Sequence, residues 1–280
     1  MSLQSFWPLP AGAELRSVNA GDVELAVLYV PVTEPRGVVH FIHGYTGSKE
    51  DAWAIAPLFT QKGFAFIAHD QRGQFQSGHA SPDTYELAQL ARDVRAIHQA
   101  LGVDKAHVIG HSFGGLVAQE FALQFSDALA SLTLLCTGPE ALTDRIEKFD
   151  YTRDYLSGHD AAETRDYWLR TRDPMLNLGF GDDATDLYTT RWLASDLRSV
   201  RNHLKIMSTV PNRTKEIAEL KIQTFVVYGE FDDAWPISDQ LEMASVLQAS
   251  VTVINNAGHC PNDEKPEALV EAVVSLIDKK

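Results

Sequence analysis

Ser112 lies between two glycines in Gly110-His111-Ser112-Phe113-Gly114, which follows the pattern G-x-S-x-G. A strand-like run, Ala106 to Ile109, precedes it, and the helix-like run Leu116 to Phe125 follows it. A serine on so sharp a strand-to-helix turn has a strained backbone, and side chains at the flanking positions would clash. A tight turn with a purely structural serine is the alternative, but this context favours a nucleophile. We therefore predict that Ser112 attacks a carbonyl carbon.

A glycine-containing loop, His43-Gly44-Tyr45-Thr46-Gly47, follows the apolar run Gly37 to Ile42. Enzymes with a serine on such a turn stabilise the oxyanion with one backbone N–H from this kind of loop and one from the residue after the nucleophile. The candidates here are the amides of Tyr45 and Phe113. The N-terminal end of the helix after Ser112 would add its positive dipole. The alternative is an ordinary strand-to-loop turn.

An acid and a base follow strand-like runs late in the chain. Asp232 and Asp233 follow the run Ile222 to Tyr228, and His259 follows the run Ser250 to Ile254. Acids at the carboxyl end of a parallel strand are well placed for function. Spacing alone does not choose between the two aspartates, because one could cap the next helix. His259 would be one unremarkable histidine among ten, but the order serine, acid, histidine favours it as a general base.

These groups require a scaffold that brings strand ends together. Apolar, β-branched runs alternate with helical patterns, and the clearest helix follows Ser81-Pro82-Asp83 and ends at Gly102. Such alternation predicts an α/β fold, a mostly parallel sheet with helices on both faces. The strand-like runs are residues 23–30, 37–42, 64–68, 106–109, 132–135, 222–228 and 250–254.

The alternation stops after Gly138. Residues 139–215 contain no strand-like run, and the segment is polar and helical in character. We therefore predict one α/β domain made of residues 1–138 and 216–280, interrupted by an all-helical insertion at 139–215.

Five ordered segments resemble the signature set of the α/β-hydrolase superfamily, namely HGYTGS, DQRGQFQSG, GHSFGG, GEFDDAWP and NNAGHCPNDEKPE. The resemblance implies the α/β-hydrolase fold, with a sheet of about eight strands and residues 139–215 as a lid. The family's acid stands three residues after the glycine that ends its strand, which selects Asp232. One departure is Phe75, which occupies a position where the family pattern has glycine, so we expect it to reshape the site entrance.

The resemblance also implies an acyl-enzyme mechanism. Tyr45, Phe113 and Trp235 are aromatic residues next to the expected catalytic positions, and they suggest a small to medium, largely apolar ester as substrate. The same triad could instead hydrolyse carbon–carbon or amide bonds, transfer acyl groups or support cofactor-free peroxidation. The protein could also be a small-molecule receptor. An epoxide hydrolase or dehalogenase of this fold would use an aspartate nucleophile, against which Ser112 argues. The expected substrate contacts, each of which could instead be packing, are Trp168, Tyr188, Trp192, Met207 and Trp235.

Bulk composition bounds the remaining possibilities. The formal charge of −14 disfavours nucleic acid and anionic membrane surfaces as partners. No H-E-x-x-H or G-x-G-x-x-G run occurs, so we expect neither a metal nor an organic cofactor. The two cysteines read as reduced thiols, and no secretory leader or long apolar run is evident, which predicts a cytoplasmic protein. Either a monomer or a homodimer is compatible with the sequence.

Overall fold

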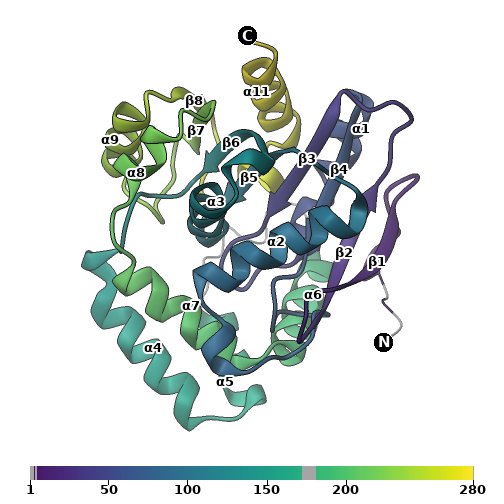
Figure 1. Cartoon of the computed structure of the whole chain (residues 1–280). Helices are drawn as coiled ribbons and strands as arrows, with labels where there is room; N and C mark the ends of the chain where they lie inside the picture. Colours follow the sequence, from purple (N-terminus) through teal and green to yellow (C-terminus); the bar gives the residue numbers. More distant parts are fainter. Residues whose placement is uncertain (1–2, 4, 172–180, 280) are drawn as a thin grey trace.

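The computed structural model describes residues 3, 5–171 and 181–279. Eight strands form one sheet (Figure 1) in the order β1-β2-β4-β3-β5-β6-β7-β8. The pairs β1–β2 and β2–β4 are antiparallel, and every other pair is parallel. The structure therefore confirms the predicted mostly parallel sheet. The strands are β1 (Glu14–Asn19), β2 (Glu24–Val30), β3 (Gly37–Ile42), β4 (Phe64–His69), β5 (Ala106–His111), β6 (Leu129–Leu135), β7 (Thr224–Gly229) and β8 (Ser250–Ile254).

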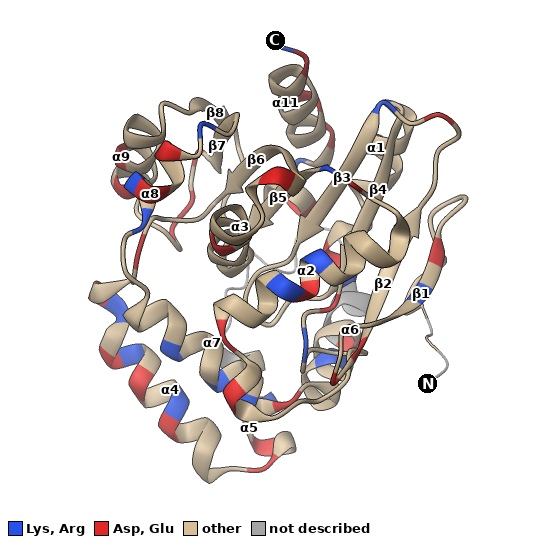
Figure 2. Ribbon diagram, viewed as in Figure 1, with Lys and Arg blue, Asp and Glu red and all other residues tan. Residues whose placement is uncertain are grey.

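The central strands are apolar because helices cover both faces of the sheet. Every residue of β4 and of β7 is buried, as expected for parallel strands inside an α/β layer structure. Figure 2 shows these strands almost free of charged residues, which lie on helices, loops and the edge strand β1 instead. The strand β1 escaped the sequence analysis because it is polar and only one of its six residues is buried.

The helices α1 (Ala56–Gln61) and α11 (Pro266–Asp278) pack together on one face of the sheet, and α2 (Leu87–Leu101) and α3 (Phe113–Gln124) pack together on the other (Figure 1). The predicted start of α2 is wrong. Pro82–Thr84 forms only a 3-10 turn, η2, and α2 begins five residues after Pro82, with Glu86 as its N-cap. Its predicted end is confirmed, because Gly102 takes the left-handed conformation with φ +68°.

Helices without strands fill the described chain between β6 and β7. They are α4 (Ile146–Gly158), α5 (Ala161–Thr171), α6 (Gly181–Ala194), α7 (Leu197–Thr209) and α8 (Thr214–Glu219), preceded by the 3-10 turn η4 (Thr143–Arg145). Figure 1 shows α4 to α7 gathered at one end of the sheet. The pattern fits the expected helical insertion, and its limits at residues 139 and 215 stay a prediction.

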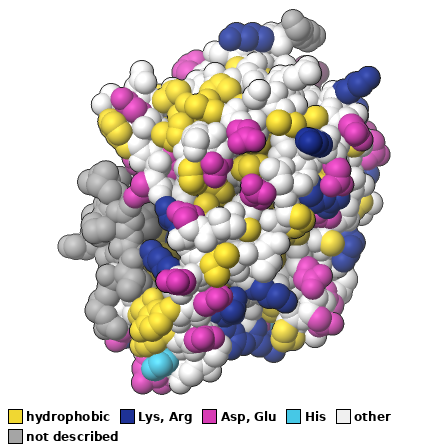
Figure 3. All heavy atoms as spheres, turned by 90° about the vertical axis from the view of Figure 1, so that its left-hand side faces the viewer, with side chains coloured by type: hydrophobic (Ala, Val, Ile, Leu, Met, Phe, Trp, Pro, Cys, Tyr) yellow, Lys and Arg dark blue, Asp and Glu magenta, His cyan; other side chains and the backbone are white. Residues whose placement is uncertain are grey.

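The sheet stops at β8, whose residues Val251 and Val253 are exposed. The neighbouring helix α9 (Ile237–Leu247) exposes Leu241 and Val246. Figure 3, which faces this side of the molecule, shows apolar side chains gathered in its upper part. None of the helices in the described part of the chain combines the length and apolar character needed to cross a bilayer.

Candidate active site

Ser112 stands on the sharp turn that joins β5 to α3, with φ 54° and ψ −122°. The two glycines of the motif are required by close contacts. A Cβ on Gly110 would lie 2.4 Å from the carbonyl oxygen of Gly114, and one on Gly114 would lie 2.2 Å from that of Ile42. The turn is also held by a hydrogen bond of 2.9 Å from the Ser112 amide to the carbonyl of Leu135. The serine is therefore fixed in a conformation that costs energy and lifts its side chain off the sheet.

A continuous chain of hydrogen bonds joins the three residues that the sequence analysis selected. The Oγ of Ser112 lies 2.9 Å from Nε2 of His259, and Nδ1 of His259 lies 2.8 Å from Oδ1 of Asp232. Asp233 is exposed, and its backbone carbonyl accepts a hydrogen bond from Arg145. The structure therefore brings Asp232, and not Asp233, to the histidine.

Asp232 is held by donors on both carboxylate oxygens. Oδ1 also accepts from the amide of Ala234 at 3.1 Å, and Oδ2 accepts from Nε2 of Gln240 at 2.8 Å. Burial on its own would raise the pKa of Asp232, but the hydrogen bond and charge of His259, with Gln240 and Ala234, outweigh it and keep this pKa below its ordinary value. The acid therefore stays ionised beside the imidazole at neutral pH.

Gln240 was missed by the sequence analysis. It lies in α9, is fully buried, and donates to the carbonyl of Trp235 at 3.2 Å as well as to Asp232. The only signal in the sequence was a polar residue on the apolar face of a predicted helix, eight positions after the acid. Such a residue normally packs with a backbone partner, so its link to the acid needed the fold.

The loop after β3 passes directly over the nucleophile. A Cβ on Gly44 would lie 3.1 Å from Cβ of Ser112, and the amide of Gly47 closes a turn onto the carbonyl of Gly44 at 3.1 Å. Within residues 3, 5–171 and 181–279, the amides of Tyr45 and Phe113 donate no hydrogen bond. Phe113 is the first residue of α3, where helix N–H groups lack internal partners. Two N–H groups without a partner in the described chain thus lie in the segments next to Ser112.

A family model described as alpha/beta hydrolase fold matches residues 37–266. The chain belongs to the α/β-hydrolase fold family. Its relatives include epoxide hydrolase 1 of Caenorhabditis elegans, 25% identical over 88% of this chain and 66% of that protein, so this chain spans just under two thirds of it. A 2-hydroxy-6-oxononadienedioate/2-hydroxy-6-oxononatrienedioate hydrolase of Comamonas testosteroni is 27% identical over 75% of this chain and 76% of that protein.

Solved structures agree with the fold. A thermophilic esterase from Thermogutta terrifontis superimposes with a TM-score of 0.78 at 22% identity, covering 95% of this chain and 99% of that chain. An enol-lactonase from Burkholderia xenovorans gives a TM-score of 0.75 at 20% identity, covering 95% and 100%. At this identity the likeness concerns the fold of this α/β-hydrolase and not its substrate.

A cavity of about 200 Å³ opens beside Ser112 and His259 in this α/β-hydrolase. Four of the five expected substrate contacts line it, namely Trp168, Tyr188, Met207 and Trp235. Trp192 is not among the described lining residues. Its ring stacks on that of Trp168 with centroids 5.2 Å apart, and its indole N–H donates to Thr164 at 3.2 Å. Trp192 thus packs against Trp168, which lines the cavity.

The cavity is more polar than the sequence suggested. Its described lining also includes charged and amide side chains from four separate segments, which are Asp51, Arg145, Arg191, Asn262 and Asp263. The sequence analysis missed them because each looks like an ordinary surface residue of a turn or helix. Only the fold places them around the nucleophile.

Phe75 does not reach the described cavity wall. Its backbone has φ 42°, a conformation that glycine adopts more readily. Its ring is buried under the ammonium group of Lys49, 4.8 Å from the ring centroid, and its amide donates to Oγ of Ser195 at 2.9 Å. Phe75 therefore ties its loop to the end of α6, and our expectation that it shapes the site entrance finds no support.

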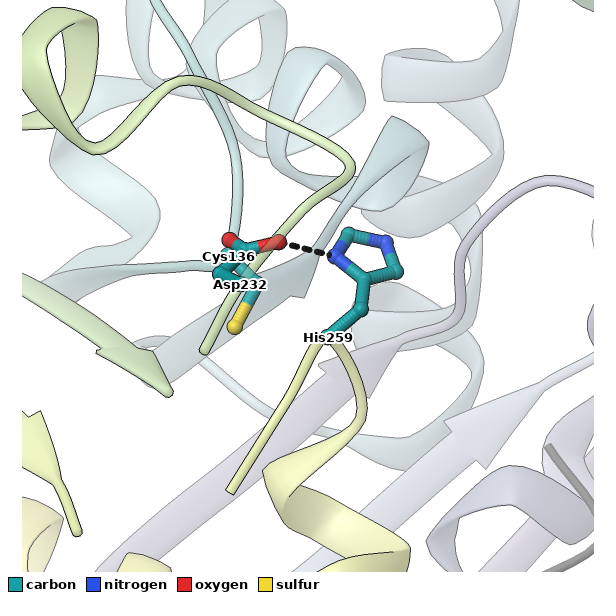
Figure 4. A group of neighbouring side chains, drawn as sticks. All are labelled: Cys136, Asp232 and His259. Carbon is teal, nitrogen blue, oxygen red and sulfur yellow. Dashed lines mark hydrogen bonds and ion pairs between the residues drawn. The ribbon is translucent and has the colours of Figure 1, made fainter. Parts of the chain in front are cut away.

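One group of side chains in the described part of the chain has the spacing of metal ligands. It consists of Cys136, Asp232 and His259, whose ligand atoms lie within 4.8 Å of one another (Figure 4). Burial raises the pKa of the Cys136 thiol well above its ordinary value, and the carboxylate oxygens of Asp232 already accept hydrogen bonds. A protonated thiol and an occupied acid are poor ligands, so we assign Asp232 and His259 to the hydrogen-bond chain and not to a metal site.

Proposed function

We propose that this α/β-hydrolase is a serine hydrolase that cleaves a carboxylic ester through an acyl-enzyme on Ser112. The observation that carries this proposal is the hydrogen-bond chain from Ser112 through His259 to Asp232 at the edge of a cavity. A serine hydroxyl is a weak nucleophile at neutral pH, and a hydrogen-bonded imidazole backed by a carboxylate is the arrangement that activates it.

The first half of the reaction forms the acyl-enzyme, an ester on Ser112. His259 Nε2 takes the Ser112 hydroxyl proton as Oγ bonds to the carbonyl carbon, and the amides of Tyr45 and Phe113 hold the resulting oxyanion. Each such donor contributes about 3 kcal/mol to catalysis in comparable sites. The intermediate then collapses, the bond to the alcohol oxygen breaks, and the imidazolium of His259 gives its proton to the departing alcohol.

The second half returns the free enzyme. His259 Nε2 takes a proton from water as the water oxygen attacks the acyl carbon, and the Ser112 oxygen leaves with that proton. Asp232 fixes the imidazole tautomer and stabilises the imidazolium in both halves. The proton therefore shuttles between two oxygens and the imidazole, and no further group is required for the balance.

The helical insertion, residues 139–215, acts in this proposal as a lid over the substrate. Phe149 from α4, Trp168 from α5 and Met207 from α7 lie in the cavity lining, so an apolar part of the substrate would contact the insertion. The size of the cavity fits a small to medium ester.

Two alternatives keep the same fold. An epoxide hydrolase of this fold would carry an aspartate where this chain has Ser112. This serine argues against epoxide hydrolysis, the activity in the name of the relative from Caenorhabditis elegans. The triad could also act on a carbon–carbon or amide bond, or transfer an acyl group, and a panel of esters, lactones, amides and diketones ranked by kcat/KM distinguishes these reactions. A receptor would turn over none of them.

Labelling with a fluorophosphonate tests the proposal directly. We expect the wild-type chain to be labelled on Ser112 and the Ser112→Ala variant to stay unlabelled while it melts at a similar temperature. A wild-type chain that resists the probe, or a label that persists in the Ser112→Ala variant, would refute the assignment of the nucleophile.

A further inference from the structure

One side of the cavity is built from polar side chains that contact one another, which we call the polar wall: Asp51, Tyr188, Arg191, Asn262 and Asp263. Arg191 Nη1 donates to Asp51 Oδ1 at 2.7 Å, and its guanidinium carbon lies 4.5 Å from the centroid of the Tyr188 ring. Asn262 Nδ2 donates to the backbone carbonyl of Asp51 at 2.9 Å. These contacts join the turn η1 (Lys49–Ala52), the helix α6 and the short helix α10 (Pro261–Glu264) into one surface.

The polar wall carries hydrogen-bonding atoms that the protein leaves unused. Arg191 Nε, Asn262 Oδ1 and Asp263 Oδ1 are buried and have no hydrogen-bond partner within the described residues. Arg191 is only 7% exposed and Asn262 only 1%. Buried polar atoms are nearly always hydrogen-bonded in folded proteins, and each exception calls for an explanation. Three such atoms belong to residues of one wall of the reaction cavity, where a bound ligand would supply the missing partners.

A second part of the cavity lining is apolar. We call it the apolar wall, and it consists of Leu142, Phe149, Met207 and Trp235. Each of these side chains is less than 10% exposed. A substrate that fills the cavity therefore contacts both hydrocarbon and hydrogen-bonding side chains.

The charges of the polar wall select a neutral partner. The positive charge of Arg191 is already paired with Asp51 at 2.7 Å. A substrate carboxylate placed there would approach Asp51, and a substrate ammonium group would approach Arg191, so either ion would be buried next to a like charge. Burial and the nearby Asp51 raise the pKa of Asp263 well above its ordinary value, which favours the neutral carboxyl form of this side chain.

We propose that the polar wall is a specificity site for a neutral hydroxyl-bearing group, so that the substrate is an ester with an apolar part and a hydroxylated part. A hydroxyl group both donates and accepts, which matches a wall that offers Nε of Arg191 as a donor and Oδ1 of Asn262 as an acceptor. This proposal rests on the proposed function, because it concerns the substrate of the same cavity.

Matched esters test the proposal. One set has the 4-nitrophenyl group and an acyl chain of six or eight carbons that ends in methyl, hydroxyl, carboxylate or ammonium. A second set consists of acetate esters of alcohols with the same endings. Because the ending is remote from the reacting carbonyl, intrinsic reactivity is the same throughout each set. We expect the hydroxyl ending to exceed the methyl ending in kcat/KM by about tenfold in at least one set.

Three variants locate the effect. In Asn262→Leu, which removes the unused acceptor at similar volume, we expect the ratio of kcat/KM for the hydroxyl ending to that for the methyl ending to fall to about twofold or less. Asp263→Asn keeps a neutral side chain that can donate and should retain the preference. Met207→Ala in the apolar wall should lower kcat/KM for both endings by the same factor. Thermal unfolding of each variant shows whether it is folded.

The outcomes separate this proposal from the proposed function. If no ester of either set is hydrolysed and the wild-type chain resists fluorophosphonate, the proposed function fails. If the methyl esters are hydrolysed and the hydroxyl ending brings no gain, or if a carboxylate bound through Arg145 is preferred, the proposed function stands and the polar wall as a hydroxyl site is overturned. A preference that survives Asn262→Leu in the folded protein overturns it as well.

Discussion

Gln240 offers the sharpest test of how the acid is positioned. Its Nε2 donates to Oδ2 of Asp232 at 2.8 Å, and the side chain is fully buried. A hydrogen bond to a buried ionised group contributes about 1.5–3 kcal/mol. If that interaction is lost in Gln240→Leu, we expect kcat/KM to fall about 10- to 100-fold, since 1.4 kcal/mol corresponds to a factor of ten.

The pH dependence separates this role from simple packing. Gln240 stabilises the ionised form of Asp232, and it is one of the donors that hold the pKa of this acid below its ordinary value. Removing the donor raises that pKa, so the loss of activity at low pH should begin at a higher pH in Gln240→Leu than in the wild type. KM should change little because Gln240 is not among the described residues that line the cavity.

The assay is the pH profile of kcat/KM for a short-chain nitrophenyl ester, measured between pH 4 and pH 9 with thermal unfolding recorded in parallel. Gln61→Leu, an exposed glutamine at the end of α1, is the matched control and should behave as wild type. Gln240→Glu keeps the shape but donates only while protonated, so its activity should decline as the pH rises. A folded Gln240→Leu variant with an unchanged rate and an unchanged acid limb would refute the reasoning.

Three further predictions follow from named contacts. Asp232→Asn should lower kcat on the order of 10⁴-fold by analogy with other triads, whereas Asp233→Asn should stay within a few-fold of wild type in the same ester assay. Gly114→Ala forces a methyl group against a backbone carbonyl at 2.2 Å and should cost about 3 kcal/mol of unfolding free energy or more, while Gly158→Ala, which meets open space, should cost nothing. Burial lowers the pKa of His98 from 6.5 to about 4. Between these two pH values the unfolded chain binds one more proton than the folded chain, so the free energy of unfolding falls as the pH falls. In urea titrations, His98→Phe should reduce the slope of the unfolding free energy against pH by about 1.4 kcal/mol per pH unit.

Each of these predictions has an outcome that would contradict it. Equal losses in the two aspartate variants, or a larger loss at Asp233, would reassign the acid. A Gly114→Ala protein as stable as wild type would show that the close contact relaxes freely. An unchanged slope between pH 6.5 and pH 4 in His98→Phe would mean that this histidine is protonated in the folded chain.

The sequence predicted Ser112 and His259 of the hydrogen-bond chain because each is tied to a local pattern. Ser112 is marked by flanking glycines that its turn requires, and His259 by its place after the last strand. The choice of Asp232 over Asp233 came from family resemblance alone, since both follow the same strand. In the structure Oδ1 of Asp232 lies 2.8 Å from Nδ1 of His259.

Features that depend on contacts between distant segments could not be predicted. Gln240 is a buried polar residue whose partner lies eight positions away around a loop, and the polar wall joins η1, α6 and α10. Trp168 and Trp192 could not be distinguished by the sequence. In the structure Trp168 lines the cavity, and the ring of Trp192 stacks on that of Trp168. Strand β1 was missed because its pairing with β2, and not its own apolar pattern, makes it a strand.

The central claim is that the oxygen of Ser112 becomes covalently acylated during turnover. The most direct measurement is a rapid acid quench of the chain with a 4-nitrophenyl ester, followed by peptide mapping in a mass spectrometer. The account predicts an initial burst of nitrophenol of one equivalent per chain and an acyl group on the peptide that contains Ser112. An acyl group on another residue, or turnover that persists in Ser112→Ala, would contradict it.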